Sequence, residues 1–151
     1  MLVVFGSDHA GLNLKAQLKA YVETAGHSTH DLGTFTLESC DYPNIAAAVT
    51  HKVVEAQCLG VLICGSGIGM SMAANRFPGI RAALCTNEYM ARMSRLHNNA
   101  NILCLGERIL GLDLAKAIVE AFVATPFEGG RHLRRIQQMD AMPLSKPSNP
   151  L

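Results

Sequence analysis

The sequence predicts a single α/β domain, built on a doubly wound sheet of about five parallel strands with helices on both faces. Short apolar runs alternate with helical patterns along the chain, which is typical of a parallel sheet. The run at residues 61–64 is continuously apolar, as in a strand buried on both faces. At 151 residues the chain has the length of about one domain.

The first half of the chain contains two predicted strands and two helices. Residues 2–5 form an apolar run that ends at Gly6. The next apolar residues fall three or four apart, which is helical spacing, until Gly26 ends the pattern. Residues 28–32 suit a short second strand, and the Asp-Tyr-Pro sequence at 41–43 opens an Ala-rich helix.

The second half repeats strand and helix three times. The strand at 61–64 runs into a Gly-rich loop and a short helix that reaches Asn75. Two more strands are predicted at residues 80–85 and 101–105, followed by helices at 88–96 and 112–124.

The C-terminal part differs from this pattern. After a Gly-Gly break, a basic helical segment at residues 131–142 adds no strand, so we expect this helix to reach away from the sheet toward a second subunit. Residues 143–151 are rich in Pro and Ser and are predicted to form an extended or disordered tail. The domain is therefore expected to span residues 1–142.

Composition excludes several classes of protein. Thirteen Lys and Arg residues nearly balance twelve Asp and Glu residues, which argues against a nucleic-acid-binding surface. No apolar run approaches the roughly 20 residues of a membrane span. The five cysteines are odd in number, form no C-x-x-C pair and follow no signal peptide, so a reducing cytoplasm is expected.

Ligands of open parallel sheets bind beyond the carboxyl ends of the strands. The sequence places polar clusters at four positions expected to lie there: residues 7–9, 64–69, 97–99 and 106–108. The loop at 64–69 carries three glycines at alternate positions before a helix start, a combination that favours anion binding.

Three common anion loops do not match this one. A dinucleotide fingerprint needs another glycine spacing on the first strand, and a nucleoside-triphosphate loop needs a lysine. A cysteine phosphatase loop needs an arginine at the position of Met70. What remains is a thiol, that of Cys64, at the start of a helix. A helix start favours the thiolate form, and a thiolate can abstract a proton.

Plainer interpretations stay open beside these. Cys64 could be an inert buried cysteine, Asp8 a helix N-cap and His9 an ordinary loop histidine. Arg131 and Arg135 are four residues apart on one helix face, which suits a phosphate dianion but also a solvated surface. Arg108 is a weaker phosphate candidate. No metal site is expected, because closely spaced pairs of ligands are missing.

Several motifs together resemble the type B ribose-5-phosphate isomerases, which belong with the subunits of galactose-6-phosphate isomerase. The motifs are GSDHAG at 6–11, DYP at 41–43, CGSGIGMS at 64–71, AAN at 73–75, SRLHN at 94–98 and GGRH at 129–132. The resemblance covers nearly the whole chain to about residue 142. It implies a Rossmann-like fold and a homodimer whose active sites are built from both subunits. Whether such dimers pair into tetramers is left open. It also implies an aldose–ketose isomerisation that needs no cofactor.

The resemblance also implies roles for individual residues. Cys64 is the expected base, Ser66 handles protons on the substrate oxygens, and His97, with Asp8, opens the sugar ring. The expected anion hole and substrate-binding residues are Tyr42, Gly65, Gly67, Ile68, Gly69, Ser71 and Asn98, and the expected phosphate ligands are His9, Arg108, Arg131 and Arg135. One branch of the family uses a loop glutamate as base; this chain has Met70 there and matches the cysteine branch.

The expected reaction interconverts ribose 5-phosphate and ribulose 5-phosphate. Two alternatives remain. A hexose 6-phosphate such as allose 6-phosphate or galactose 6-phosphate needs the same chemistry in a longer pocket. The other alternative is a protein that binds a sugar phosphate without catalysing a reaction. The joint presence of the candidate catalytic residues argues against it.

Overall fold

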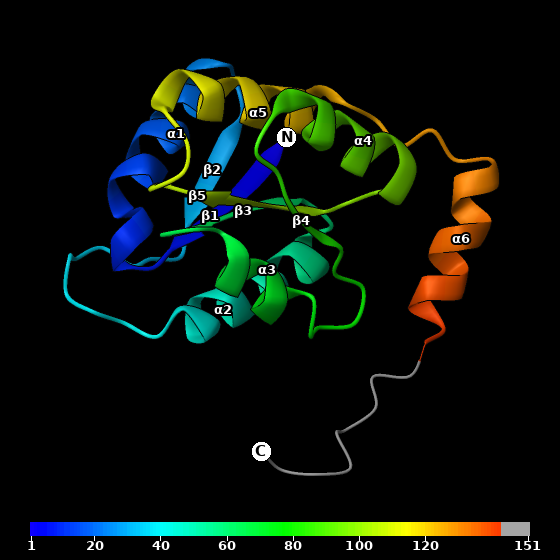
Figure 1. Cartoon of the computed structure of the whole chain (residues 1–151), viewed down its shortest axis with the longest axis horizontal. Helices are drawn as coiled ribbons and strands as arrows, with labels where there is room; N and C mark the ends of the chain where they lie inside the picture. The colour runs from blue at the N-terminus through cyan, green and yellow to red at the C-terminus, as the bar shows by residue number, and fades with distance from the viewer. Residues whose placement is uncertain (143–151) are drawn as a thin grey trace, which may run out of the picture.

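Five parallel strands form one sheet in the order β2-β1-β3-β5-β4 (Figure 1). This computed structural model describes residues 1–142, so the prediction made for the tail lies outside the described residues. The strands are β1 (Leu2–Ser7), β2 (Ser28–Asp31), β3 (Leu59–Cys64), β4 (Ala82–Leu84) and β5 (Ile102–Gly106). The predicted doubly wound α/β sheet is confirmed.

Helices cover both faces of the sheet (Figure 1). The helices of the described residues are the short 3₁₀ turn η1 (His9–Gly11), α1 (Leu12–Thr24), α2 (Tyr42–Ala56), α3 (Ile68–Ala74), α4 (Glu88–Asn98), α5 (Leu112–Ala124) and α6 (Arg131–Asp140). Apolar residues of α1, α4 and α5 pack on one face, and those of α2 and α3 pack on the other. Every residue of β3 is buried, because helices cover this central strand from both sides.

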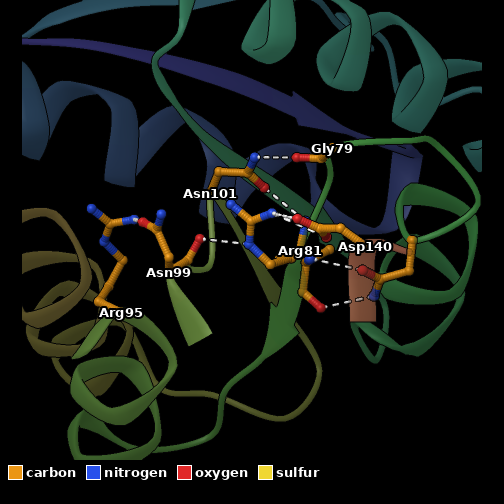
Figure 2. Close-up of polar contacts among 8 residues, drawn as sticks. Gly79, Arg81, Arg95, Asn99, Asn101 and Asp140 are labelled. Atoms are coloured by element: carbon orange, nitrogen blue, oxygen red, sulfur yellow. Dashed lines mark hydrogen bonds and ion pairs between the residues drawn. The ribbon is translucent and has the colours of Figure 1, made fainter. Parts of the chain in front are cut away.

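The edge strand β4 is shorter than the predicted strand at 80–85. Its expected first residues belong instead to a turn, in which the Ile80 N–H donates to the Phe77 carbonyl. The Arg81 N–H donates to the side chain of Asn101 at 2.8 Å rather than to a neighbouring strand (Figure 2). Side-chain hydrogen bonds thus replace the first part of the strand ladder.

Helix α6 stands apart from the rest of the molecule (Figure 1). Its far end is tied back by an ion pair between Arg81 and Asp140, with Nη1 and Oδ2 3.4 Å apart (Figure 2). Ile136 is buried, but Leu133 and Met139 of the same helix are exposed. The helix therefore reaches away from the sheet as expected, with apolar side chains uncovered. No described helix is long and apolar enough to cross a membrane.

A buried ion pair holds the loop that follows β2. The Lys15 side chain on α1 is only 1% exposed, and its Nζ lies 2.6 Å from both Asp31 Oδ1 and the Thr34 carbonyl. The ring of Phe35 lies 4.7 Å from the same ammonium group. These contacts fasten the loop across the carboxyl end of β1.

We expect Lys15→Met to lower the free energy of unfolding by about 3 kcal/mol, because it leaves the Asp31 carboxylate without its buried partner. Lys52→Met, which breaks the exposed pair with Glu55, should cost less than about 0.5 kcal/mol. Urea unfolding of both variants measures the difference. Equal effects of the two changes would show that the buried pair does not stabilise the fold.

Candidate active site

A cleft of about 410 Å³ opens where the order of strands reverses, between the carboxyl ends of β1 and β3. The chain passes from β1 to β2 on one side of this point and returns to β3 on the other. The cleft is lined by Asp8, His9, Ala10, Tyr42, Cys64, Gly65, Ser66, Gly69, Arg108 and Ile109. The structure thus brings together many of the residues predicted from the sequence.

Cys64 is the last residue of β3 and is 6% exposed. The chain turns directly after it, with Gly67 at a φ of 77°, a backbone conformation that favours glycine. This turn aims the Gly67 N–H at the Cys64 Sγ, with a nitrogen–sulfur distance of 3.1 Å. The hydrogen bond stabilises negative charge on the sulfur.

Burial weakens the acidity of three other cysteines, the buried Cys85 and Cys104 and the half-buried Cys58. Burial raises the pKa of the Cys85 thiol to about 11, and it also raises the pKa of Cys104. Burial raises the pKa of Cys58 as well. These three side chains therefore stay protonated thiols at neutral pH, and the cleft contains none of them.

Asp8 and His9 follow β1 and form the opposite wall of the cleft. Asp8 Oδ1 accepts the Ala10 N–H at 2.9 Å, so Asp8 is the N-cap of η1, as one of the two interpretations predicted. His9 Nδ1 accepts the N–H of Cys40 at 3.4 Å. An accepting Nδ1 leaves the ring proton on Nε2, where it can donate to an anion.

The turn after β5 brings Arg108 to the cleft. The Glu107 N–H donates to the Cys64 carbonyl at 2.9 Å, and the Arg108 N–H donates to the Gly65 carbonyl at 3.1 Å. Gly106 allows this close approach, because a Cβ at this position would lie 2.7 Å from the backbone of Ser66. Glu107 Oε2 also accepts the Leu14 N–H of α1 at 2.9 Å. The guanidinium is thus held beside the loop of Cys64.

The loop itself supplies the floor of the cleft. Ser66 Oγ accepts the Ile68 N–H at 3.3 Å, and Ser71 Oγ donates to the Ile68 carbonyl at 2.8 Å. Tyr42, at the start of α2, lies against Gly69, where an added Cβ would be 2.8 Å from its ring. Gly67, Ile68 and Ser71 do not line the cleft, although their loop does.

The remaining predicted residues lie elsewhere, and for His97 and Asn98 the predicted location was wrong. Both lie at the end of α4, just before β5 begins, and therefore at the amino ends of the strands rather than the carboxyl ends. A helix that connects parallel strands must return to the opposite edge of the sheet. Asn98 lines a separate cavity of about 710 Å³ beside Arg81 and Met139. Arg131 and Arg135 are exposed on α6.

His97 is part of a cluster that the sequence did not predict. Its ring stacks on that of His132, with centroids 4.3 Å apart, and Glu128 Oε2 lies 3.8 Å from His97 Nε2 and 3.9 Å from His132 Nε2. Glu128 and His132 are four residues apart in the sequence, so the pair could have been noticed. Nothing in the sequence places them beside α4. These three side chains could hold a metal ion.

A doubly wound sheet, with a thiol, an imidazole and a guanidinium gathered at its switch point, has the features of an α/β enzyme that acts on a small anionic substrate. The model of the ribose/galactose isomerase family matches residues 3–139. Ribose-5-phosphate isomerase B of Escherichia coli is 43% identical over 141 residues, which cover 93% of this chain and 95% of that protein. Ribose-5-phosphate isomerase B of Mycolicibacterium paratuberculosis is 44% identical, with 90% and 87% covered.

Solved structures of similar proteins indicate the same family as these relatives. The structure of ribose-5-phosphate isomerase B from Clostridium thermocellum superposes with a TM-score of 0.91 at 50% identity, covering 93% of this chain and 95% of that one. The enzyme from Thermotoga maritima gives a TM-score of 0.91 at 48% identity, with 93% and 98% covered. The chain belongs to the ribose/galactose isomerase family and is a sugar phosphate isomerase. The resemblance noted from the sequence is confirmed.

Proposed function

We propose that the protein interconverts D-ribose 5-phosphate and D-ribulose 5-phosphate, with Cys64 as the base. One observation carries this proposal: the Cys64 sulfur lines the switch-point cleft and receives the Gly67 N–H at 3.1 Å. Relatives named for this reaction share 43–44% of their residues with the chain. The reaction belongs to the pentose phosphate pathway, and the cytoplasm is its proposed location.

The chemistry needs one proton to move between neighbouring carbons. The Cys64 thiolate removes the proton from C2 of the open-chain aldose, and the electrons move toward the carbonyl oxygen to form a cis-enediolate. The loop around Gly65 supplies dipoles where this charge develops. Ser66 moves a proton between the two substrate oxygens, and the Cys64 thiol returns its proton to C1 to give the ketose.

The site also needs groups that open the ring and bind the phosphate. Ring opening removes a proton from the anomeric hydroxyl and gives one to the ring oxygen, steps that we assign to Asp8 and His97. His9 and Arg108 bind the phosphate from within the cleft. Tyr42 contacts the sugar beside Gly69. Neither a metal nor an organic cofactor is needed for these steps.

We propose that a second copy of the chain completes this site. His97, Asn98, Arg131 and Arg135 do not line the cleft of their own chain. Helix α6 stands away from its own sheet with Leu133 and Met139 exposed, which suits packing on a partner (Figure 1). In a symmetric dimer each copy contributes its α4 end and α6 to the cleft of the other.

The substrate is tested by measuring turnover of ribose 5-phosphate, allose 6-phosphate and galactose 6-phosphate under the same conditions. We expect the highest kcat/KM for ribose 5-phosphate. Turnover of a hexose 6-phosphate without turnover of ribose 5-phosphate would overturn the choice of a pentose. Binding of all three without any turnover would favour a sugar phosphate-binding module.

Arg131→Ala is expected to raise KM by about tenfold or more while changing kcat less, because a charge-assisted bond to phosphate contributes about 1.5–3 kcal/mol of binding. Arg134 is exposed on the same helix and has no assigned role, so Arg134→Ala is the matched control. Steady-state kinetics of both variants measure the effect. An unchanged KM in Arg131→Ala would show that Arg131 does not bind the phosphate and that this helix face is an ordinary solvated surface.

A further inference from the structure

Two histidines and a glutamate meet where α6 begins, outside the cleft of the same chain. The donor atoms of His97, Glu128 and His132 all lie within 4.8 Å of one another. The two rings stack with an angle of 9° between their planes, and their Nε2 atoms lie 3.8 and 3.9 Å from Glu128 Oε2.

The backbone holds this cluster in place. The Glu128 N–H donates to the Leu96 carbonyl at 3.1 Å, which fastens the segment before α6 to the last turn of α4. Gly129 and Gly130 both have positive φ, and the sharp turn they allow starts α6 with His132 directed inward. Three ligands from two separate segments are therefore brought together by the fold.

The donor atoms of the cluster suit a metal. The His132 side chain is only 6% exposed. Its Nε2 accepts a long hydrogen bond of 3.4 Å from Arg131 Nε, so the lone pair is on that nitrogen. Two imidazoles and a carboxylate are a donor set that Zn²⁺ prefers, with a fourth position left for water.

Binding requires a small rearrangement. Zinc bonds of about 2.0–2.1 Å in a tetrahedron place neighbouring donors about 3.3 Å apart. The distances of 3.8 and 3.9 Å from Glu128 to the two histidines must therefore shorten by roughly 0.5 Å, and the stacked rings must turn until both lone pairs point at the ion. The His97 and Glu128 side chains are 38% and 55% exposed, so they can pivot toward the buried His132. The positive charges of Arg131 and Arg135 oppose the ion and weaken its binding.

We propose that His97, Glu128 and His132 form a zinc site, and that a bound zinc ion inhibits the enzyme by occupying His97. The binding stands on the geometry of the cluster alone. The inhibition rests on the proposed function, in which His97 takes part in ring opening. Zinc in this position is an inhibitor and not a cofactor of the isomerisation.

Equilibrium dialysis with Zn²⁺ tests the binding, and the Cys64→Ala variant is used because the thiol of the cleft is itself a zinc ligand. We expect about one zinc ion per chain in Cys64→Ala. Adding Glu128→Gln should weaken binding at least tenfold, whereas the exposed control Asp113→Asn should leave it unchanged. Co²⁺ bound to Cys64→Ala should show the visible absorption of a tetrahedral nitrogen and oxygen site, without a sulfur charge-transfer band.

Two results would overturn the zinc site. One is the loss of zinc binding in Cys64→Ala, which would assign the ion to the thiol. The other is undiminished binding in Glu128→Gln, or in His132→Gln where that variant folds. Glu128 is exposed, so its variant remains informative if His132→Gln fails to fold.

Activity measurements separate this proposal from the proposed function. Zinc should inhibit the wild type reversibly, with recovery on adding a chelator, and Glu128→Gln should require at least tenfold more zinc while keeping its activity without zinc. Zinc binding at the cluster with full activity of the zinc-bound enzyme would overturn the inhibition. An enzyme inactive toward ribose 5-phosphate even without zinc would instead contradict the proposed function and leave the binding result intact.

Discussion

Replacing Cys64 by alanine is expected to lower kcat toward ribose 5-phosphate by about 10³-fold, with little change in substrate affinity. The sulfur is the only group that we assign to the proton between C1 and C2, and the alanine side chain has no atom that can accept it. The methyl group fills part of the same space at the end of β3, so the loop keeps the hydrogen bonds from the Glu107 N–H to the carbonyl of residue 64 and from the Arg108 N–H to the Gly65 carbonyl.

A control separates the loss of the base from the loss of a cysteine. Cys58 lies at the amino end of β3, half-buried and away from the cleft, so Cys58→Ser should keep nearly full activity. Steady-state kinetics give kcat and KM for both variants, and binding of a non-reacting sugar phosphate shows that the Cys64→Ala cleft is intact. Turnover by Cys64→Ala within a few-fold of the wild type would assign the base to another group.

Mixing two inactive variants is expected to restore activity if each cleft is completed by a second copy. In a dimer of one Cys64→Ala chain and one His97→Asn chain, one cleft carries both changes and the other carries neither. Random exchange of subunits makes about half of the dimers mixed, so the mixture should reach about one quarter of wild-type activity. Each variant alone should stay nearly inactive, so the gain is large.

The matched control mixes Cys64→Ala with Ser66→Ala. Both residues line the same cleft of one chain, so every cleft in the mixed dimer keeps one change and no activity should return. Native mass spectrometry with one chain isotopically labelled confirms that mixed dimers form. Mixed dimers without recovered activity in the His97 pairing would show that His97 does not act on the partner's cleft.

Much of the candidate site could be predicted because its residues directly follow strands. Asp8 and His9 follow β1, Cys64 ends β3 and Arg108 follows β5, and parallel strands bring their carboxyl ends to one edge of the sheet. For Cys64 the glycine spacing added a local signal, since the turn at Gly67 is what aims an N–H at the sulfur. The sequence pattern predicts where each strand ends, and the end of the strand determines where these residues lie.

Residues on helices were harder to place. His97 was expected at the carboxyl edge, although it ends a helix that returns to the amino edge. The sequence pattern predicts where the strands lie along the chain, but it does not predict which strands are neighbours in the sheet. The arrangement β2-β1-β3-β5-β4 is therefore known only from the structure. The short β4 depends on the side chain of Asn101, twenty residues from its partner Arg81 (Figure 2).

The sequence by itself determined the alternation of strands and helices, the family, and the position of Cys64 at the end of a strand before a glycine-rich loop, because each is recorded in short local motifs. Only the tertiary structure decided which side chains meet across the fold. It separated His97 and Arg131 from the cleft of their own chain, and it gathered His97, Glu128 and His132 into one cluster. The physical reason is that packing of α4 and α6 depends on contacts between residues about 30 positions apart, and no local pattern encodes those contacts.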